Sequence, residues 1–492
     1  MKGLRLHIVW LLMALTVLPA VTSCYNYDEE DVSYSDASAN YINVTISVSA
    51  SDNAFTRAPQ GGEYGDGTEK GFEREYEVRN ITLIFYQNGT DGNGINTTSD
   101  DAVVKCVKSY VVRPMTGSDL PTAHNHKTGE PETAQGQEVL YTTGNQKLDD
   151  SLLQLGETYR LLVVANASVD VSVGNKIKDV RDKVAGSVYT GSGAGIDVSY
   201  FVMTSETDAS VTLADPSVES TSSQTNFIYY LPCIHLERLA ARIDYCTNGA
   251  TYSDTFNGFK YNIGSTDNDG FYIITKVTPF NLYNDQEYLF KRVRNNWTVA
   301  TPVITYLGDE STTNYVVDPK TASKDNGETV ISYLSPIAEN MSNNNNYTQV
   351  MNSLSDGQTF TAADGYNNVI IAYPKENTLM PSSHLKKYAT GIAFEANYYA
   401  NPDATPITRV YYHYLRHQGE LSTGNYQAHQ WGDLSDTEST SSHDPLVPMN
   451  YGVVRNNIYR ISIEGFSTVE GTIKIKIEEK HWRHVDNPTI YI

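Results

Sequence analysis

Cysteine and basic residues are scarce in this chain of 492 residues. It contains 4 Cys, and no two of them stand in a CxxC spacing, so the fold is expected to depend on a hydrophobic core rather than on disulfides. Lys and Arg total 36 against 58 Asp and Glu, which gives a formal net charge of −22. This acidic balance argues against binding nucleic acid or anionic lipid through a basic face.

Recognisable catalytic motifs are also absent. The sequence has no GxSxG, HExxH, P-loop or GxGxxG pattern. His413 and His417 fall on one face of a predicted strand, and His124 and His126 lie in a predicted loop. Neither pair completes a ligand set with Cys or carboxylate at metal-binding spacing. We therefore predict packed or solvated histidines, no metal site, no cofactor and no enzymatic activity.

Residues 1–23 have the pattern of a lipoprotein signal peptide. Lys2 and Arg5 precede the apolar run Ile8–Leu18, which is too short to span a bilayer as a stable helix. Small residues then precede Cys24, and no later apolar run reaches 18 residues. We predict lipidation at Cys24, so that the precursor contacts the membrane only through its lipid.

A short amphipathic strand is predicted after Cys24. Ile42, Val44, Ile46 and Val48 alternate with polar residues, which is typical of a strand with one face in a core. This strand lies between the lipid and the rest of the chain. It can therefore complete a core in the precursor and be removed later.

Arg57 follows this strand and precedes a glycine-rich segment. Because proteases need extended, mobile backbone, Arg57 is preferred as a cleavage site over Arg74 and over Arg79, which comes just before a predicted strand. A cut between Arg57 and Ala58 would separate everything downstream from the lipid and would remove the amphipathic strand.

The dominant periodicity of the remaining chain is two, so a mostly β protein is predicted. The expected strands are Ile81–Tyr86, Val103–Val112, Tyr159–Ala165, Phe201–Thr204, Phe227–Leu231, Leu239–Tyr245, Phe271–Val277, Val369–Tyr373, Thr390–Tyr399, Arg409–Tyr414, Ile458–Glu464 and Thr472–Glu478. One short helix is expected over Lys176–Val184, where apolar residues repeat at helical spacing.

The length of the chain predicts two or three domains. A Ser/Thr-rich stretch before Phe227 is the expected boundary. The predicted organisation is a signal peptide over residues 1–23, a lipidated propeptide over 24–57, an N-terminal domain over 58–225 and a C-terminal domain over 226–492.

Several segments resemble the fimbrillins of Bacteroidetes type V pili, with the likeness closest to stalk subunits of the minor fimbrium. The segments are Tyr159–Ala167, Phe201–Thr204, Leu236–Ile243, Tyr373–Asn377 and Gly452–Ile461. The acidic run of residues 28–31 similarly resembles the export signal of surface lipoproteins in this phylum. The tail His481–Pro488 departs from the family pattern.

The resemblance implies two transthyretin-like β-sandwich domains in tandem. It implies an outer-membrane lipoprotein precursor that becomes part of a cell-surface fimbria through proteolysis-triggered strand exchange. The implied partners are other copies of the chain, accessory pilus subunits, a maturation protease that cuts after Arg, and host or bacterial surface ligands.

A second amphipathic strand lies near the C-terminus. Ile473, Ile475 and Ile477 alternate with charged residues, as a strand with one buried face does. A groove left by removal of the first strand would expose backbone groups and an apolar slot, which is a template for strand addition. We predict that these three isoleucines belong to a donor strand that enters a neighbouring subunit.

Other functions stay open at this point. A surface glycan-binding lipoprotein would use exposed aromatic residues as sugar platforms, although an aromatic ladder across paired strands explains the same residues equally well. The aromatic residues concerned are Tyr398, Tyr399, Tyr411, Tyr412, Tyr414 and Trp431. A secreted hydrolase is disfavoured by the missing motifs. Within a pilus, a tip subunit need not donate a C-terminal strand, and an anchor should retain its lipidated one. Because both the Arg57 site and the Ile473–Ile477 strand are present, a stalk subunit is preferred.

Overall fold

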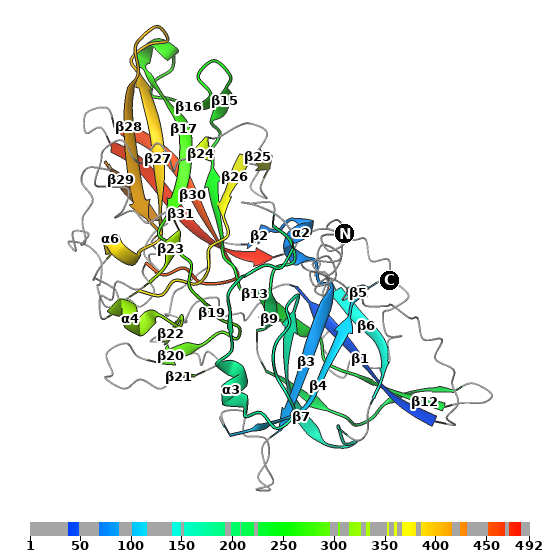
Figure 1. Ribbon diagram of the computed structural model, residues 1–492. Coiled ribbons are helices and arrows are strands. Elements are labelled where there is room, and N and C mark those ends of the chain that lie inside the picture. The colour runs from blue at the N-terminus through cyan, green and yellow to red at the C-terminus, as the bar shows by residue number, and fades with distance from the viewer. Residues whose placement is uncertain are drawn as a thin grey trace, which may run out of the picture.

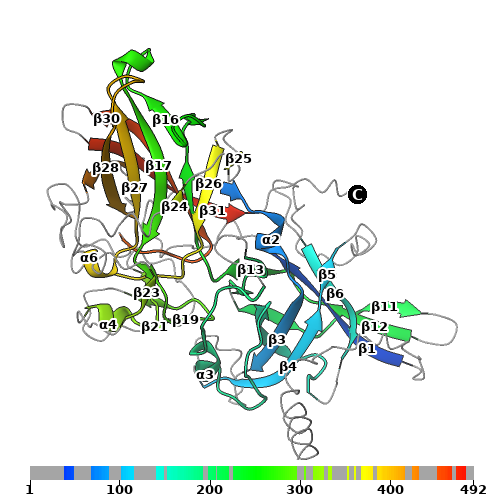
Figure 2. The same ribbon diagram turned by 45° about the horizontal axis from the view of Figure 1, so that its top comes forward.

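The computed structural model describes the greater part of the chain, and this part is mostly β, as predicted (Figure 1). The described residues are 38–48, 68–87, 101–115, 140–148, 152–191, 198–206, 208–220, 225–295, 304–305, 314–325, 331–334, 352–353, 359–361, 367–379, 385–415, 424–430, 451–467 and 472–483. Most of these residues gather in two lobes, which remain side by side when the molecule is turned (Figure 2).

The first lobe is built on an 11-stranded sheet. Its strands are β1 (Ser38–Ser47), β3 (Asn80–Gln87), β4 (Val103–Val111), β5 (Arg113–Pro114), β6 (Leu140–Lys147), β7 (Thr158–Ala165), β9 (Met203–Ser205), β10 (Ala209–Thr212), β11 (Ser217–Ser220), β12 (Thr225–Tyr230) and β13 (Ile234–Arg238). β3 lies between β4 and β7 and is buried on both faces, which explains why its sequence is apolar almost throughout.

The second lobe is built on a 13-stranded sheet. Its strands are β2 (Thr68–Lys70), β14 (Arg242–Cys246), β15 (Thr251–Ser253), β16 (Gly258–Asn262), β17 (Phe271–Phe280), β24 (Asn352–Ser353), β25 (Thr359–Thr361), β26 (Asn367–Ala372), β27 (Gly391–Tyr399), β28 (Ile407–Tyr414), β29 (Gly424–Gln430), β30 (Asn457–Ser467) and β31 (Thr472–Arg483).

Short elements complete the described structure. They are the strands β8 (Val184–Ala185), β18 (Leu282–Tyr283), β19 (Glu287–Tyr288), β20 (Val293–Asn295), β21 (Ile304–Thr305), β22 (Asn314–Val316) and β23 (Tyr333–Leu334), the helices α2 (Glu73–Tyr76), α3 (Ile177–Arg181), α4 (Thr321–Asp325) and α6 (Leu385–Tyr388), and the 3₁₀ turn η1 (Asp267–Asp269). Helix α3 lies within the range predicted for it. No helix in the described ranges is long and apolar enough to cross a membrane.

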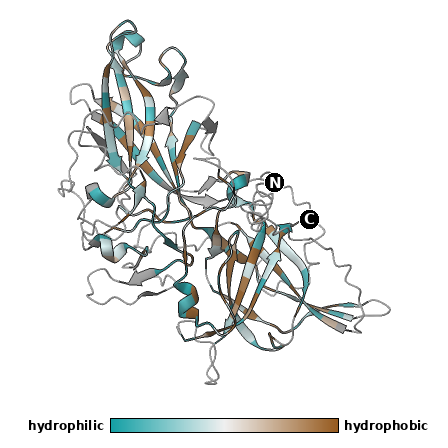
Figure 3. Cartoon of the chain, viewed as in Figure 1, coloured by the Kyte–Doolittle hydropathy of each residue, from teal (hydrophilic) through white to brown (hydrophobic). Residues whose placement is uncertain are grey.

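Each lobe has its own hydrophobic core. The largest cluster of buried side chains belongs to the first lobe and a second cluster to the second lobe. Apolar residues accordingly concentrate on the strands of both lobes (Figure 3). No disulfide joins Cys106, Cys233 and Cys246.

The change from one sheet to the other occurs later in the chain than the predicted domain boundary. Both β12 and β13 belong to the first sheet, and β14 is the next strand of the second. The sheets therefore change between Arg238 and Arg242, inside the single strand expected over Leu239–Tyr245. The division at residues 225 and 226 stays a prediction about domains, but sheet membership does not follow it.

Glu75 of α2 lies in a buried cluster of charges between the lobes. Arg242 donates to Glu75 Oε2 over 3.0 Å and to both oxygens of Asp244 over 2.9 and 2.7 Å. Tyr373 donates to Glu75 Oε1, and Arg238 Nε donates to the Glu75 carbonyl over 2.6 Å. We call these five residues the Glu75 cluster. It ties α2 to strands of both sheets.

Arg455 forms a second buried cluster at the same junction. Its Nη2 donates to Glu376 Oε2 over 2.7 Å and lies 3.4 Å from Glu287 Oε1. The same guanidinium donates to the carbonyls of Tyr288 and Leu289 over 2.6 and 2.8 Å. Arg455, Glu287 and Glu376, which we call the Arg455 cluster, are all fully buried.

The carboxylates of the Arg455 cluster are held in water-poor surroundings. Burial raises the pKa of Glu287 well above its ordinary value, an effect that Arg455 opposes and Glu376 increases. Burial likewise raises the pKa of Glu376, again against the attraction of Arg455. Glu287 Oε2 has no hydrogen-bond partner among the described residues. Glu376 is therefore the better-satisfied partner of Arg455.

We predict that Arg455→Met lowers the free energy of unfolding by about 3–5 kcal/mol, because it leaves two buried carboxylates without their cation. Glu287→Gln should change it by less than about 1 kcal/mol at pH 7, because Arg455 keeps Glu376. Urea denaturation measures both. Equal losses in the two variants would contradict the unequal roles of the two glutamates.

The raised pKa of Glu287 also predicts that the stability of the fold depends on pH. Because the pKa of Glu287 is raised on folding, the stability linked to it is fully present below its ordinary pKa of 4.5 and is lost as the pH rises through the folded-state value. Glu287→Gln should therefore lose less stability than the parent chain between pH 5 and 8. A steeper loss in the variant would contradict this assignment.

Candidate functional site: the first strand and its groove

Strand β1 lies inside the first sheet, with hydrogen-bonded neighbours on both sides. It pairs antiparallel with β6 on one side and parallel with β12 and then β13 on the other. Its removal would expose the edges of β6 and of β12 together. The groove it fills is therefore a slot between two strands, with unpaired backbone groups on both walls.

The side chains predicted to face inward do so. Ile42, Val44, Ile46 and Val48 are at most 1% exposed and belong to the first core. Burying an apolar side chain of this size is worth about 1.5–3 kcal/mol, so the four contribute roughly 6–12 kcal/mol. While β1 is in place, it is a structural part of the first lobe.

The pairing with β6 includes an irregularity that fixes its register. The register shifts between Asn43 and Thr45, where Val44 N donates to the side chain of Thr143 over 3.1 Å. Thr142 Oγ1 donates to Asn43 Oδ1 over 3.0 Å. Side chains of β6 thus satisfy polar groups of β1 where the ladder of backbone hydrogen bonds is interrupted.

The C-terminal strand lies in the chain's own second lobe. β31 pairs antiparallel with β30 on one side and with β29 on the other. Ile473 and Ile475 are fully buried and Ile477 is 7% exposed, all within the second core. In this chain both edges of the strand are paired, with β29 and with β30. The donation of Ile473, Ile475 and Ile477 to a neighbouring subunit stays a prediction.

The end of β31 extends beyond the predicted strand. Its last residues pair in parallel with β2, so that Thr68 lies opposite His481 and Lys70 opposite Arg483. The unfamiliar tail sequence that begins at His481 is thus partly strand. Residues 484–492 lie outside the described residues.

We predict that Ile475→Asp prevents folding of the second lobe, because it places a carboxylate in an apolar core. Lys474→Asp is the matched control, since Lys474 is exposed on the opposite face of β31. Thermal unfolding followed by circular dichroism should show a large loss only for Ile475→Asp. A folded Ile475→Asp chain that fails to polymerise would restore the donor role instead.

The aromatic residues considered as a sugar platform are mostly core residues. Tyr411, Tyr412 and Tyr414 of β28 are at most 2% exposed, with Tyr411 in one core cluster and the other two in another. Tyr399 stacks on Phe271 with ring centroids 5.1 Å apart and an interplanar angle of 11°. The three tyrosines of β28 are therefore core residues and do not offer a sugar-binding face, whereas Tyr398 and Tyr399 of β27 are partly buried. Trp431 lies outside the described residues.

His413 is a packed core histidine. It is 2% exposed, and its Nδ1 lies 2.5 Å from the carbonyl of Tyr414. No group of three or more metal-ligating side chains occurs in the part of the chain that the structure describes. His124, His126 and His417 lie outside it.

The residues of the predicted maturation step, Cys24, Arg57 and Ala58, also lie outside the described residues. The two competing arginines are described. Arg74 is part of α2, and Arg79 is held by its backbone, since its N–H donates to Asn166 Oδ1 over 2.9 Å and its carbonyl accepts from Val112 N over 3.0 Å. A protease would have to break this structure to cut at either residue.

Solved structures that match this chain include three proteins of Bacteroidetes. One is named as a candidate cell adhesion protein from Parabacteroides distasonis, with 10% identity and a TM-score of 0.43 over 90% of this chain and 100% of that one. Another, from Bacteroides eggerthii, has the same description, with 9% identity and a TM-score of 0.37 over 91% and 98%. The tip fimbrial protein Mfa3 from Porphyromonas gingivalis has 10% identity and a TM-score of 0.38 over 90% and 99%.

No protein-family model and no curated protein matches the chain. At TM-scores below 0.5, the structural likenesses define neither a family nor a function for it.

Proposed function

We propose that this chain is a subunit of a cell-surface fimbria with a role in adhesion. It would be exported as an outer-membrane lipoprotein precursor and matured by loss of its first strand. The observation that carries the proposal is the position of β1, which completes the first core and is paired on both sides. The resemblance of the sequence to fimbrillins supports it. The proposed role is structural and adhesive and involves no catalysis.

Strand exchange is the proposed mechanism. In the precursor, β1 fills the groove between β6 and β12, which prevents another strand from binding there. A cut after Arg57 would leave β1 held only by non-covalent contacts. A strand from another subunit with apolar residues at alternating positions could then take its place. The buried side chains of β1 show which size and spacing the groove accepts.

A terminal place in the fimbria is proposed rather than a place in the stalk. A stalk subunit must both accept a strand and donate one. Here β31 is paired on both sides, and its isoleucines fill the second core. Within the described residues, the observation therefore favours a subunit that accepts a strand at β1 and does not donate β31.

We predict lipidation at Cys24. Mass spectrometry of the precursor extracted from membranes should find acyl chains on an N-terminal cysteine, because the small residues before Cys24 form the expected cleavage site. Cys24→Ser should abolish the acyl chains and release the precursor from the membrane fraction. An acylated Cys24→Ser protein, or a parent precursor that starts elsewhere, would contradict this prediction.

We predict that maturation cuts between Arg57 and Ala58 and makes β1 exchangeable. N-terminal sequencing of the mature form should begin at Ala58. After cleavage, a labelled peptide of residues 38–48 should bind the chain, and the same peptide with Ile46→Asp should not, because Ile46 is fully buried in the groove.

The uncleaved Arg57→Ala chain is the control for this experiment. It should bind neither peptide, since its own β1 still occupies the groove. The cleaved chain alone should form no ladder of polymers in an unboiled gel. A ladder would favour the stalk over the terminal place, and peptide binding to Arg57→Ala would contradict cleavage as the trigger.

A further inference from the structure

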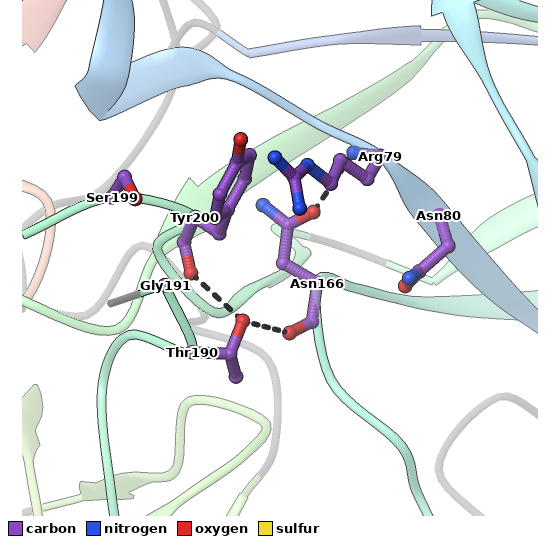
Figure 4. Close-up of a pocket in the computed structure, with 7 residues that line it drawn as sticks. All are labelled: Arg79, Asn80, Asn166, Thr190, Gly191, Ser199 and Tyr200. Atoms are coloured by element: carbon purple, nitrogen blue, oxygen red, sulfur yellow. Dashed lines mark hydrogen bonds between the residues drawn. The ribbon is translucent and has the colours of Figure 1, made fainter. Parts of the chain in front are cut away.

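A polar pocket lies at the end of the first sheet where β3 begins and β7 ends (Figure 4). Its volume is about 390 Å³, and it is lined by Arg79, Asn80, Asn166, Thr190, Ser199 and Tyr200 among others. A volume in this range suits a ligand of one or two sugar rings. The lining is almost entirely polar, which disfavours an apolar ligand.

Asn166 holds the walls of the pocket together. Its backbone is left-handed, with φ of 58°. Its side chain accepts from Arg79 N over 2.9 Å and donates to the carbonyls of Glu77 and Phe201 over 2.8 and 3.0 Å. Thr190 Oγ1 donates to the Asn166 carbonyl over 2.9 Å. Four separate segments are thereby fixed before any ligand arrives.

Tyr200 is held in an uncommon conformation beside this residue. Its φ is 54°, a left-handed value that is rare for an aromatic residue. Across from it, a Cβ added to Gly191 would lie 2.7 Å from the carbonyl oxygen of Ser199, so only glycine allows the two segments to approach so closely. Backbone strain of this kind concentrates at functional sites.

The strained geometry places the Tyr200 ring against the guanidinium of Arg79. The Arg79 Cζ lies 3.5 Å from the ring centroid, a distance at which the cation is attracted to the face of the ring. Among the described residues, only the Glu77 carboxylate approaches it as a counter-charge, 4.0 Å from Nε, and the Arg79 side chain is 63% exposed. The donors of this guanidinium therefore remain available to a ligand.

We propose that this pocket binds a carboxylate-bearing sugar residue. The planar fork of a guanidinium matches a carboxylate with two parallel hydrogen bonds. Hydroxyl and amide groups of Ser199, Tyr200 and Asn80 suit the hydroxyl groups of a sugar ring. The net charge of −22 disfavours a polyanionic ligand. As an adhesive site, it rests on the proposed function, but its geometry does not involve β1.

Methyl β-glucuronide and methyl β-glucoside are matched probes, because they differ only in a carboxylate in place of a hydroxymethyl group. Saturation-transfer NMR titration with the uncleaved full chain should show binding of the glucuronide and at least ten-fold weaker binding of the glucoside. Arg79→Gln should weaken glucuronide binding at least ten-fold, and Arg79→Lys should weaken it several-fold, because lysine keeps the charge but not the planar fork.

Arg409→Gln is the control variant, since Arg409 is an exposed arginine on β28 of the other lobe. It should bind the glucuronide as the parent chain does. Unchanged melting temperatures would show that the variants are folded, as expected for two exposed side chains. Equal binding of both glycosides, or full binding by Arg79→Gln, would overturn the proposal.

A peptide C-terminus could supply the same carboxylate as a sugar acid. N-acetylglycine, which presents a carboxylate on a peptide-like group, tests this alternative. Tighter binding of N-acetylglycine than of the glucuronide would overturn the assignment to a sugar in favour of a peptide end. Because the uncleaved chain is used throughout, failure of this site would leave strand exchange untouched. A failed cleavage at Arg57 would equally leave the glucuronide titration intact.

Discussion

The ion pairs buried between the lobes are the constraint on which the rest of the molecule depends. Arg242 and Arg455 are both fully buried, and each binds at least one carboxylate from another segment of the chain. A charge without water is tolerated only when its partners stay in place, so the geometry of each cluster is fixed once the chain folds. This fixes α2, which carries Glu75.

The buried clusters also give a physical account of the sequence segments that resemble fimbrillins. Arg238 and Arg242 come from one of these segments, Tyr373 and Glu376 from another, and Arg455 from a third. Segments that are far apart in the sequence meet at the junction between the lobes. Residues of these segments therefore help to hold the two lobes together.

The strands could be predicted from the sequence because alternation of apolar residues directly reflects the burial of one sheet face. Most predicted strands are present with ends shifted by a few residues. β6 is not predicted because it has few apolar residues. The break before Arg242 is not predicted because it has the same apolar character as the strands around it. The charged clusters could not be predicted, because a buried Glu in a sequence looks the same as an exposed one.

At the candidate site, too, the sequence predicts which residues are buried but not what they contact. β1 and β31 have nearly identical patterns of β-branched residues, and each pattern correctly predicts a buried face. A pattern does not say whose core the face fills, since this depends on which edges are already paired. The tyrosines of β28 were open to two interpretations for a similar reason, and their burial on both faces of the strand decides between them.

The double-sided pairing of β1 has a mechanical consequence. Hydrogen bonds between strands lie across the strand direction, so a pull along β1 loads the bonds to β6 and to β12 at the same moment, in shear. A pull on one end away from the sheet would instead open them one pair after another. A strand seated in this groove is thus strongest against tension along its own axis.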